Sequence, residues 1–185
     1  MNSTPILYFL RSSEQKIITD MIKYAYGLDD KENVLDFYPE LNIYSELYGV
    51  TPKDLGLYAL VDNKIAGALW CRQLCKEHGA SGFIDENTPV LSMSIFPEFR
   101  EKKVGTTMME QFLLEASTCY EQISIALLSD STAILFYEKF GFEIVEGSHK
   151  KSKIHKREIL IMLKKLDKKE LVRPSDGYDP RRWMD

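Results

Sequence analysis

Residues 97–107 read PEFREKKVGTT and lie between an apolar run and a helical repeat. The preceding residues 90–96, VLSMSIF, predict a mostly buried strand, and a helix is expected to begin near Val104 or Gly105. The apolar residues that recur at helical spacing are Met108, Met109, Phe112, Leu113 and Ala116. A short loop that enters a helix N-terminus presents backbone N–H groups to an anion, and the lysines of this loop add positive charge. The stretch therefore predicts a site for a phosphate-bearing ligand.

The composition is that of one ordinary globular domain. The 185 residues are 44% hydrophobic and 28% charged, which suffices for a full core, and no apolar run has the length to cross a bilayer. The first residues lack the features of a signal peptide, and three cysteines are too few and odd in number for a disulfide framework. These features predict a protein of the reducing cytoplasm.

Charge is distributed unevenly along the chain. The net charge is −4, but residues 149–185 are basic whereas the preceding residues are strongly acidic. Because nucleic-acid binding needs a basic face against the phosphates, the acidic body disfavours it. A basic cluster in the second part is typical of a solvated hairpin, with a contact to an anionic partner as the alternative. It consists of Lys150, Lys151, Lys153, Lys156 and Arg157.

Strands and helices alternate along the chain. We expect strands over residues 7–10, 57–61, 65–70, 90–96, 123–128, 142–145 and 158–163. Helices are expected from Ser13 to a cap at Gly27, as short turns over 33–48, after the 97–107 loop, and over 133–140. This order predicts a mixed α/β domain over residues 1–166, with a central sheet of about six or seven strands flanked by helices. Residues 167–185 are expected to form an irregular tail.

Two segments resemble the GCN5-related N-acetyltransferase (GNAT) superfamily. Residues 95–106, IFPEFREKKVGT, are similar to the family's pyrophosphate loop, Gln/Arg-x-x-Gly-x-Gly/Ala. Residues 130–142, DSTAILFYEKFGF, are similar to its Asn-x-x-Ala-x-x-x-Tyr-x-x-x-Gly-Phe segment. The order of elements also fits over residues 5–163. The resemblance therefore implies the GNAT-like acyl-CoA N-acyltransferase fold, with acetyl-CoA as co-substrate.

The resemblance also implies which residues bind the cofactor. Backbone N–H groups of residues 102–107 would face the pyrophosphate oxygens, with help from the helix dipole and the Thr106 hydroxyl. Met93 and Ile95 would offer strand-edge N–H and C=O groups to the amides of the pantetheine arm. The full expected set is Met93, Ile95, Arg100, Lys102, Lys103, Val104, Gly105, Thr106, Thr107, Asp130 and Ala133.

Two residues depart from the family pattern. Lys103 stands where the family usually has its first glycine, and it is expected to fit if its φ stays ordinary and its side chain points outward. Asp130 stands where the family usually has Asn. A carboxylate near the CoA anion is unfavourable, so we expect Asp130 to cap the helix over 133–140, with direct cofactor contact as the alternative.

Tyr137 is the expected catalytic acid, because the matching tyrosine of the family protonates the thiolate leaving group. Core packing, expected for Phe136 and Phe140 of the same helix, is the alternative. The implied reaction is direct attack of a neutral amine on the thioester, whose carbonyl a strand N–H would polarise. The base that takes the proton of the amine is not identified. Asp85 and Glu86 are candidates, with ordinary loop charges as the alternative.

Two further groups of residues invite a functional interpretation. Cys71, Cys75 and His78 could suggest zinc, but a fourth ligand and closer cysteine pairing are lacking, so structural cysteines and no metal are expected. Residues 36–48 lie where the family builds its acceptor wall, and an amphipathic surface helix is the alternative. If they line a cleft, their tyrosines and carboxylates favour a cationic amine.

These expectations combine into an acetyl-CoA-dependent N-acetyltransferase that acts on an amine of a small molecule or peptide and needs no membrane. Members of the family often pair through their last strands, so the resemblance also raises a homodimer. One alternative is a CoA-binding regulatory or interaction module without acceptor chemistry. Another is an enzyme that acetylates aminoacyl-tRNA through its basic end.

Overall fold

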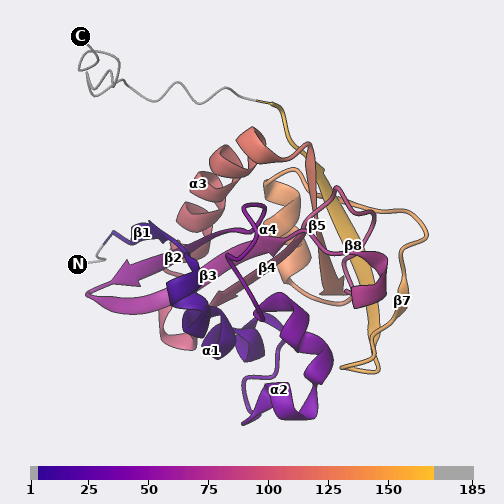
Figure 1. Cartoon of the computed structure of the whole chain (residues 1–185), viewed down its shortest axis with the longest axis horizontal. Coiled ribbons are helices and arrows are strands. Elements are labelled where there is room, and N and C mark those ends of the chain that lie inside the picture. Colours follow the sequence, from indigo (N-terminus) through magenta and orange to yellow (C-terminus); the bar gives the residue numbers. More distant parts are fainter. Residues whose placement is uncertain (1–3, 169–185) are drawn as a thin grey trace.

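The computed structural model describes residues 4–168, in which helices flank a central sheet (Figure 1). The helices are α1 (Gln15–Ala25), α2 (Val34–Phe37), α3 (Val104–Cys119) and α4 (Ala133–Lys139). The strands are β1 (Ile6–Phe9), β2 (Leu55–Val61), β3 (Lys64–Arg72), β4 (Val90–Ile95), β5 (Gln122–Leu128), β6 (Glu143–Ile144), β7 (Lys150–Lys151) and β8 (Glu158–Lys165). Short 3-10 turns occupy Ser12–Glu14, Pro39–Tyr44, Lys76–His78 and Pro97–Phe99. The predicted mixed α/β fold is confirmed, and the tail expected over 167–185 lies outside the described residues from 169 onward.

The eight strands form one sheet in the order β1-β2-β3-β4-β5-β8-β6, with β7 paired to β8. All pairs are antiparallel except β4 and β5, which run parallel. The sheet therefore has one strand more than the six or seven expected from the sequence. The added strand, β7, lies in the basic connection before β8 and is only two residues long, which is too short to produce an alternating pattern.

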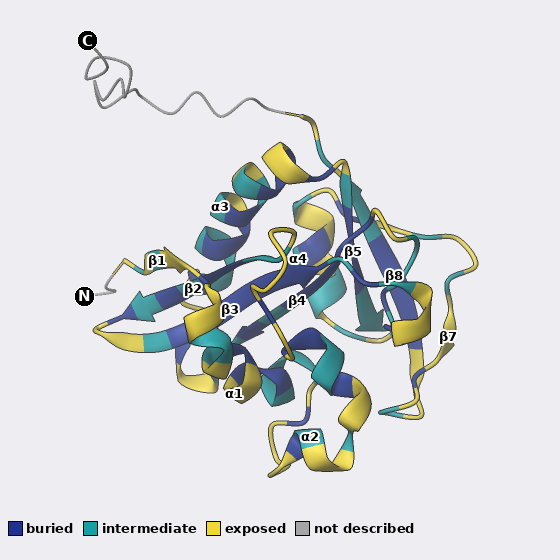
Figure 2. Cartoon of the chain, in the orientation of Figure 1, coloured by how far each residue is buried: buried dark blue, intermediate teal, exposed yellow. Residues whose placement is uncertain are grey.

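Two cores lie on opposite faces of the sheet. Helix α1 buries Ile18, Met21 and Ile22 against one face, together with the turns over 34–48. Helices α3 and α4 cover the other face. Figure 2 shows the resulting band of buried residues along the central strands. No helix within residues 4–168 combines the length and the apolarity that a bilayer span requires.

Strand β4 separates the two cores because its side chains alternate between the faces. Val90 packs with the α1 core, whereas Leu91 packs with the α3 core, and Met93 and Ile95 follow Leu91. Strand β4 thus contributes side chains to both cores. The candidate site begins at the point along β4 where its pairing with β5 ends.

Candidate active site

Strands β4 and β5 separate after a single residue pair, Val90 with Ser124. The space between them is a cleft of about 750 Å³, lined by both strands, the start of α3, helix α4, the end of α1 and the turn after β7. Residues from both faces of β4 line it, including Ser92 and Met93. The cleft therefore reaches from one face of the sheet to the other.

The main chain of β4 offers a polar edge to this cleft. Phe96 donates its N–H to Ala66 of β3 at 2.9 Å, so the even-numbered residues bond to β3 and the odd-numbered residues turn their main-chain groups toward β5. Met93 and Ile95 accordingly face the cleft with their N–H and C=O groups. The Ile95 carbonyl oxygen already accepts a bond from Arg100 Nε at 3.2 Å. A ligand in the cleft would therefore meet mainly the Met93 amide and the Ile95 N–H.

The first turn of α3 closes one end of the cleft. Val104, Gly105 and Thr106, which belong to the expected cofactor set, all line it. A Cβ added to Gly105 would lie 2.7 Å from Met93 Cε, so this helix start packs closely against β4. The free N–H groups of a helix start give this end of the cleft a positive potential.

Lys102 and Thr107, also in the expected cofactor set, do not line the cleft with their side chains. Lys102 Nζ lies over the Phe99 ring, 5.6 Å from its centroid. Thr107 Oγ1 donates a hydrogen bond to the Lys103 carbonyl at 3.1 Å. Any contact of these two residues with a ligand would therefore involve their backbone.

The condition under which Lys103 was expected to fit, an ordinary φ, is not met. Lys103 has φ 63° and Glu101 has φ 61°, both in the left-handed region. Lys103 is the residue immediately before α3, so the loop enters the helix through left-handed backbone at the position where the family usually has a glycine.

Lys103→Gly should raise the free energy of unfolding by about 1 kcal/mol, or the melting temperature by roughly 2–4 °C, because a left-handed conformation strains any residue with a Cβ. Acetyl-CoA affinity should be retained. The matched control is Lys102→Gly, since Lys102 has no positive φ and gains nothing from a glycine. Thermal unfolding of both variants checks the prediction, and equal melting temperatures would contradict it.

Arg100 links the loop to the end of α1. Its Nη2 lies 2.8 Å from Asp29 Oδ2, and its Nε bonds to Ile95 as described. Both Arg100 and Asp29 line the cleft. The guanidinium therefore stands at the α3 end of the cleft but already has a carboxylate partner there.

Tyr137 lines the cleft from α4 and is 5% exposed. Its ring lies edge-on to Phe136 and to Phe142, each at 5.3 Å between centroids. Its hydroxyl has no hydrogen-bond partner among residues 4–168, and burial raises the pKa of the phenol. A protonated phenol without a protein partner, at the wall of a cleft, is available to a ligand atom.

The expectation that Asp130 caps α4 is wrong. Thr132 is the N-cap residue of α4 and makes no side-chain cap bond, and Ser131 Oγ accepts the Ala133 N–H at 3.2 Å. Asp130 instead forms an exposed ion pair with Arg157 and is not among the residues that line the cleft, although Ala133 is. The negative charge of Asp130, which would be unfavourable beside an anionic cofactor, is thus paired with Arg157 outside the cleft.

The wall of the cleft on the α1 side consists largely of residues with hydroxyl groups. Apart from Tyr44, these residues were not predicted from the sequence to be part of a site. Tyr26 and Tyr44 line the cleft with ring centroids 5.1 Å apart, and burial raises the pKa of both phenols. Ser92 and Ser94 are each 4% exposed, and neither Oγ has a hydrogen-bond partner among the described residues. Buried polar atoms without partners are uncommon and mark places where a ligand or water is accommodated.

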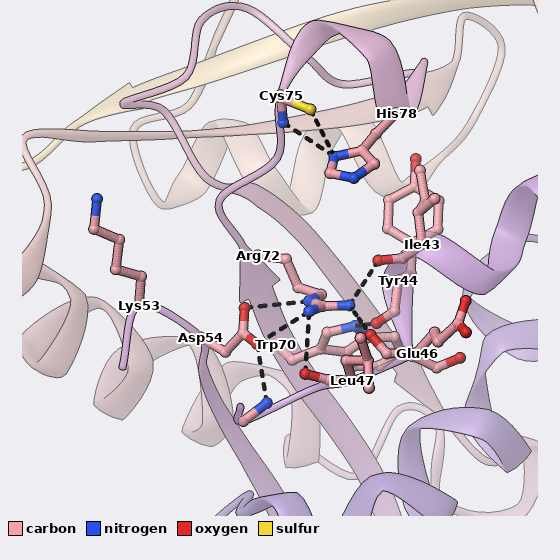
Figure 3. A network of polar contacts seen from close by, with 12 residues as sticks. Ile43, Tyr44, Glu46, Leu47, Lys53, Asp54, Trp70, Arg72, Cys75 and His78 are labelled. Atoms are coloured by element: carbon pink, nitrogen blue, oxygen red, sulfur yellow. Dashed lines mark hydrogen bonds and ion pairs between the residues drawn. The ribbon is translucent and has the colours of Figure 1, made fainter. Parts of the chain in front are cut away.

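A buried network positions Tyr44 (Figure 3). Arg72 pairs with Asp54 at 3.1 Å and donates to the carbonyl oxygens of Ile43, at 2.9 Å, and of Glu46. Trp70 Nε1 donates to the carbonyl oxygen of Tyr44 itself at 2.9 Å. The turn that carries Tyr44 is therefore tied to β3 on both sides of the residue, while its hydroxyl accepts the Ser81 N–H at 3.3 Å.

The carboxylates considered as bases lie elsewhere. Asp85 accepts the Asn87 N–H at 2.8 Å and the Thr88 hydroxyl at 2.9 Å, and it lines a second, polar pocket. Neither Asp85 nor Glu86 lines the cleft. Of residues 36–48, only Tyr44 lines the cleft, and none of the carboxylates of this segment does. A cationic acceptor was expected if the tyrosines and carboxylates of this segment lined a cleft, and that condition is therefore not met.

Cys75 and His78 form a local contact near this network. Cys75 donates its N–H to His78 Nδ1 at 3.1 Å, and its Sγ lies 3.2 Å from the same nitrogen. Cys71 is buried, and its thiol pKa is raised by that burial. Within residues 4–168, no group of three or more His, Cys, Asp or Glu side chains is placed to hold a metal ion.

The fold matches solved acetyltransferases. An acetyltransferase of the GNAT family from Streptococcus pneumoniae superposes with a TM-score of 0.63 at 14% identity, covering 88% of this chain and 99% of that one. The ribosomal-protein-S18-alanine N-acetyltransferase of Escherichia coli gives 0.61 at 11% identity, with coverages of 95% and 100%. A phosphinothricin acetyltransferase of the GNAT superfamily from Sinorhizobium meliloti, solved in complex with AcCoA, gives 0.60 at 13% identity and covers 96% of each chain.

Comparison of the sequence with known proteins gives fewer matches than comparison of the fold. No curated protein matches the chain. The family described as acetyltransferase (GNAT) domain matches residues 53–144, which span β2 to β6 and contain β4, the pyrophosphate-loop segment, α3 and Tyr137. With this match and this fold, the chain belongs to the GNAT family of acetyltransferases.

Proposed function

We propose that the protein transfers the acetyl group of acetyl-CoA directly to an amine of a small molecule or peptide. The observation that carries the proposal is the cleft between β4 and β5, which has a helix N-terminus at one end and the unpartnered phenol of Tyr137 in its wall. The pyrophosphate would lie at the first turn of α3, where free N–H groups attract anions. The pantetheine amides would bond to the main chain of Met93 and Ile95.

The cleft separates the two reactants in a way that suits this reaction. Gly105 and Tyr137 reach it from the α3 side of the sheet, whereas the hydroxyls of Ser92 and Ser94 approach from the α1 side. The amine would enter from the α1 side and attack the thioester carbon between the strands. Tyr137 would donate its proton to the thiolate as the tetrahedral intermediate collapses, because an expelled thiolate needs an acid.

Calorimetric titration with acetyl-CoA and with CoA tests the cofactor half of this proposal. Mass spectrometry of reactions with benzylamine, glycinamide, an alanine-initiated peptide and spermidine tests the acceptor half. We expect binding of both CoA forms and a product heavier by one acetyl group for at least one amine. Absence of binding at millimolar cofactor would overturn the proposal.

A CoA-binding module without chemistry is the second candidate, because the only carboxylates of the described residues that line the cleft are Asp29, which is paired with Arg100, and Glu101, which lies on the loop before α3. Such a module would bind CoA and leave every amine of the panel unmodified. Acetylation of aminoacyl-tRNA through the basic residues around β7 would in turn require tRNA binding that weakens with salt.

A further inference from the structure

The proposed reaction needs a group that removes a proton from the attacking amine, and the cleft offers few. Its lining carboxylates are Asp29 and Glu101. Asp29 is paired with Arg100, and Glu101 is exposed on the loop before α3, at the cofactor end. Tyr26 and Tyr44 hold their protons, because burial raises the pKa of both phenols. A base on the α1 side must therefore be of another kind.

His155 lines the cleft on that side. It belongs to the turn between β7 and β8, whose neighbour Ile154 packs into the α1 core. Tyr137 belongs to the α3 core. The two side chains thus reach the cleft from opposite faces of the sheet, as a base and an acid on either side of a reacting carbon should.

The turn that carries His155 is built around Ser152, which is 5% exposed. Ser152 Oγ accepts the N–H groups of Ile154 and His155, each at 3.2 Å. Its own N–H bonds to the Arg157 carbonyl at 2.8 Å, and its carbonyl accepts the Lys156 N–H at 3.0 Å. These bonds within six residues hold the backbone of His155. Its imidazole lines the cleft and interacts with the backbone of Tyr26.

We propose that His155 is the general base, which accepts a proton from the ammonium group of the acceptor directly or through one water. The proposal rests on the proposed acetyl transfer. The neutral amine then forms the C–N bond at the thioester carbon, the C–S bond breaks, and the CoA sulfur takes the Tyr137 proton. The nitrogen of the new amide returns a proton to Tyr137, and His155 releases its proton to solvent, so the overall products are amide, CoA thiol and one proton.

The electrostatic surroundings of His155 suit a base that is neutral before the reaction. Burial lowers the pKa of the imidazole below its usual value, the nearby positive charge of Arg157 lowers it further, and the backbone of Tyr26 acts in the opposite direction. The other charged groups of the turn are Lys153 and Lys156, and from the α1 side the imidazole meets the main chain of Tyr26. At neutral pH the imidazole is therefore unprotonated and able to accept a proton.

The test compares His155→Gln and His155→Ala with the matched control His149→Gln. His149 stands at the start of the same hairpin, pairs with Glu158 at 3.2 Å, and does not line the cleft. The substrate is the amine of the panel that the wild-type protein acetylates fastest. We expect kcat/KM at neutral pH to fall on the order of 100-fold in both His155 variants. It should stay unchanged in His149→Gln, and the affinity for acetyl-CoA should be the same in all proteins.

Two readouts separate a base from a merely structural role. The wild-type kcat/KM should fall as the pH drops through an apparent pKa below about 6.5, and this fall should be absent in His155→Gln. Added free imidazole should restore at least part of the rate of His155→Ala and have no effect on wild type. Wild-type rates in the variants, an unchanged pH profile, or a lost rate that imidazole does not restore would each overturn the proposal. If the wild-type protein acetylates no amine at all, the proposed function itself fails.

Discussion

Gly105→Val should raise the dissociation constant of acetyl-CoA about 1,000-fold while the protein stays folded. Gly105 lies in the first turn of α3 and faces β4, where even a Cβ would come within 2.7 Å of Met93 Cε and 3.7 Å of Phe136 Cζ. The valine methyl groups would crowd Met93 and Phe136 and shift the first turn of α3, whose N–H groups we propose to bind the pyrophosphate. Losing two charge-assisted hydrogen bonds, each of roughly 1.5–3 kcal/mol, accounts for an effect of this size.

Gly105→Ala is the matched control for this experiment. Its single methyl group meets mainly the flexible end of Met93, which can move aside, so binding should weaken by much less than in the valine variant. Calorimetry gives the two dissociation constants, and thermal unfolding verifies that both variants fold. Normal acetyl-CoA binding by Gly105→Val would remove the assignment of this helix start as the pyrophosphate site.

Tyr137→Phe should lower kcat by roughly 100- to 10,000-fold, the range of a general acid, and leave acetyl-CoA affinity nearly intact. The hydroxyl has no partner among residues 4–168, so removing it breaks no structural hydrogen bond, and stability should be equal or slightly higher. Burial raises the pKa of this phenol, so the acid form persists through the neutral range. The alkaline loss of wild-type activity that deprotonation of the acid causes should therefore begin only above the usual tyrosine pKa of about 10.

The control for this variant is Tyr58→Phe, which removes a phenol hydroxyl from β2, outside the cleft. Steady-state kinetics with a saturating amine, together with a single-turnover measurement, shows whether the chemical step has slowed. An unchanged single-turnover rate in Tyr137→Phe would reject the acid role and leave the residue as core packing.

Local signals account for most of the fold that the sequence predicted. The hairpin of β2 and β3 turns at Asp62 and Asn63, which both adopt positive φ, as residues of this type do in two-residue turns. Gly27, expected to cap its helix, and Gly141, which directly follows the helix expected over 133–140, have φ of 62° and 79°. In each case the residue that adopts the positive φ is of a type that favours it, so the residue itself predicts the turn or the helix end.

Lys103 and Asp130 show where this reasoning stops. Lysine has no preference for a positive φ, so the residue type at position 103 gives no sign of the left-handed backbone found there. Asp130 precedes the start of α4, but Ser131 bonds to the first N–H of that helix and Asp130 pairs with Arg157, 27 residues along the chain. A local sequence pattern contains no information on such a distant partner, so it could not predict which of the two contacts Asp130 makes.

Apart from Tyr44 in the segment 36–48, the residues on the α1 side of the cleft could not be predicted, for a related reason. Tyr26, Ser92 and His155 come from three separate segments, and each looks ordinary in its own context: a helix end, a strand interior and a basic loop. Only the separation of β4 from β5 brings them to one cleft. The parallel pairing of these strands is non-local, so the sequence gives the elements but not their convergence.

The two walls of the acceptor side are attached to the protein in different ways, and this bears on how the specificity of the family can diverge. The wall at Tyr44 is anchored to Trp70 and Arg72, so its replacement would disturb the interior and cost stability. The turn that carries His155 is held mainly by bonds that Ser152 makes within the turn and by the packing of Ile154. Variation in acceptor choice should therefore accumulate at the exposed positions of this turn, around Ser152, Ile154 and His155, where a new side chain costs the domain little stability.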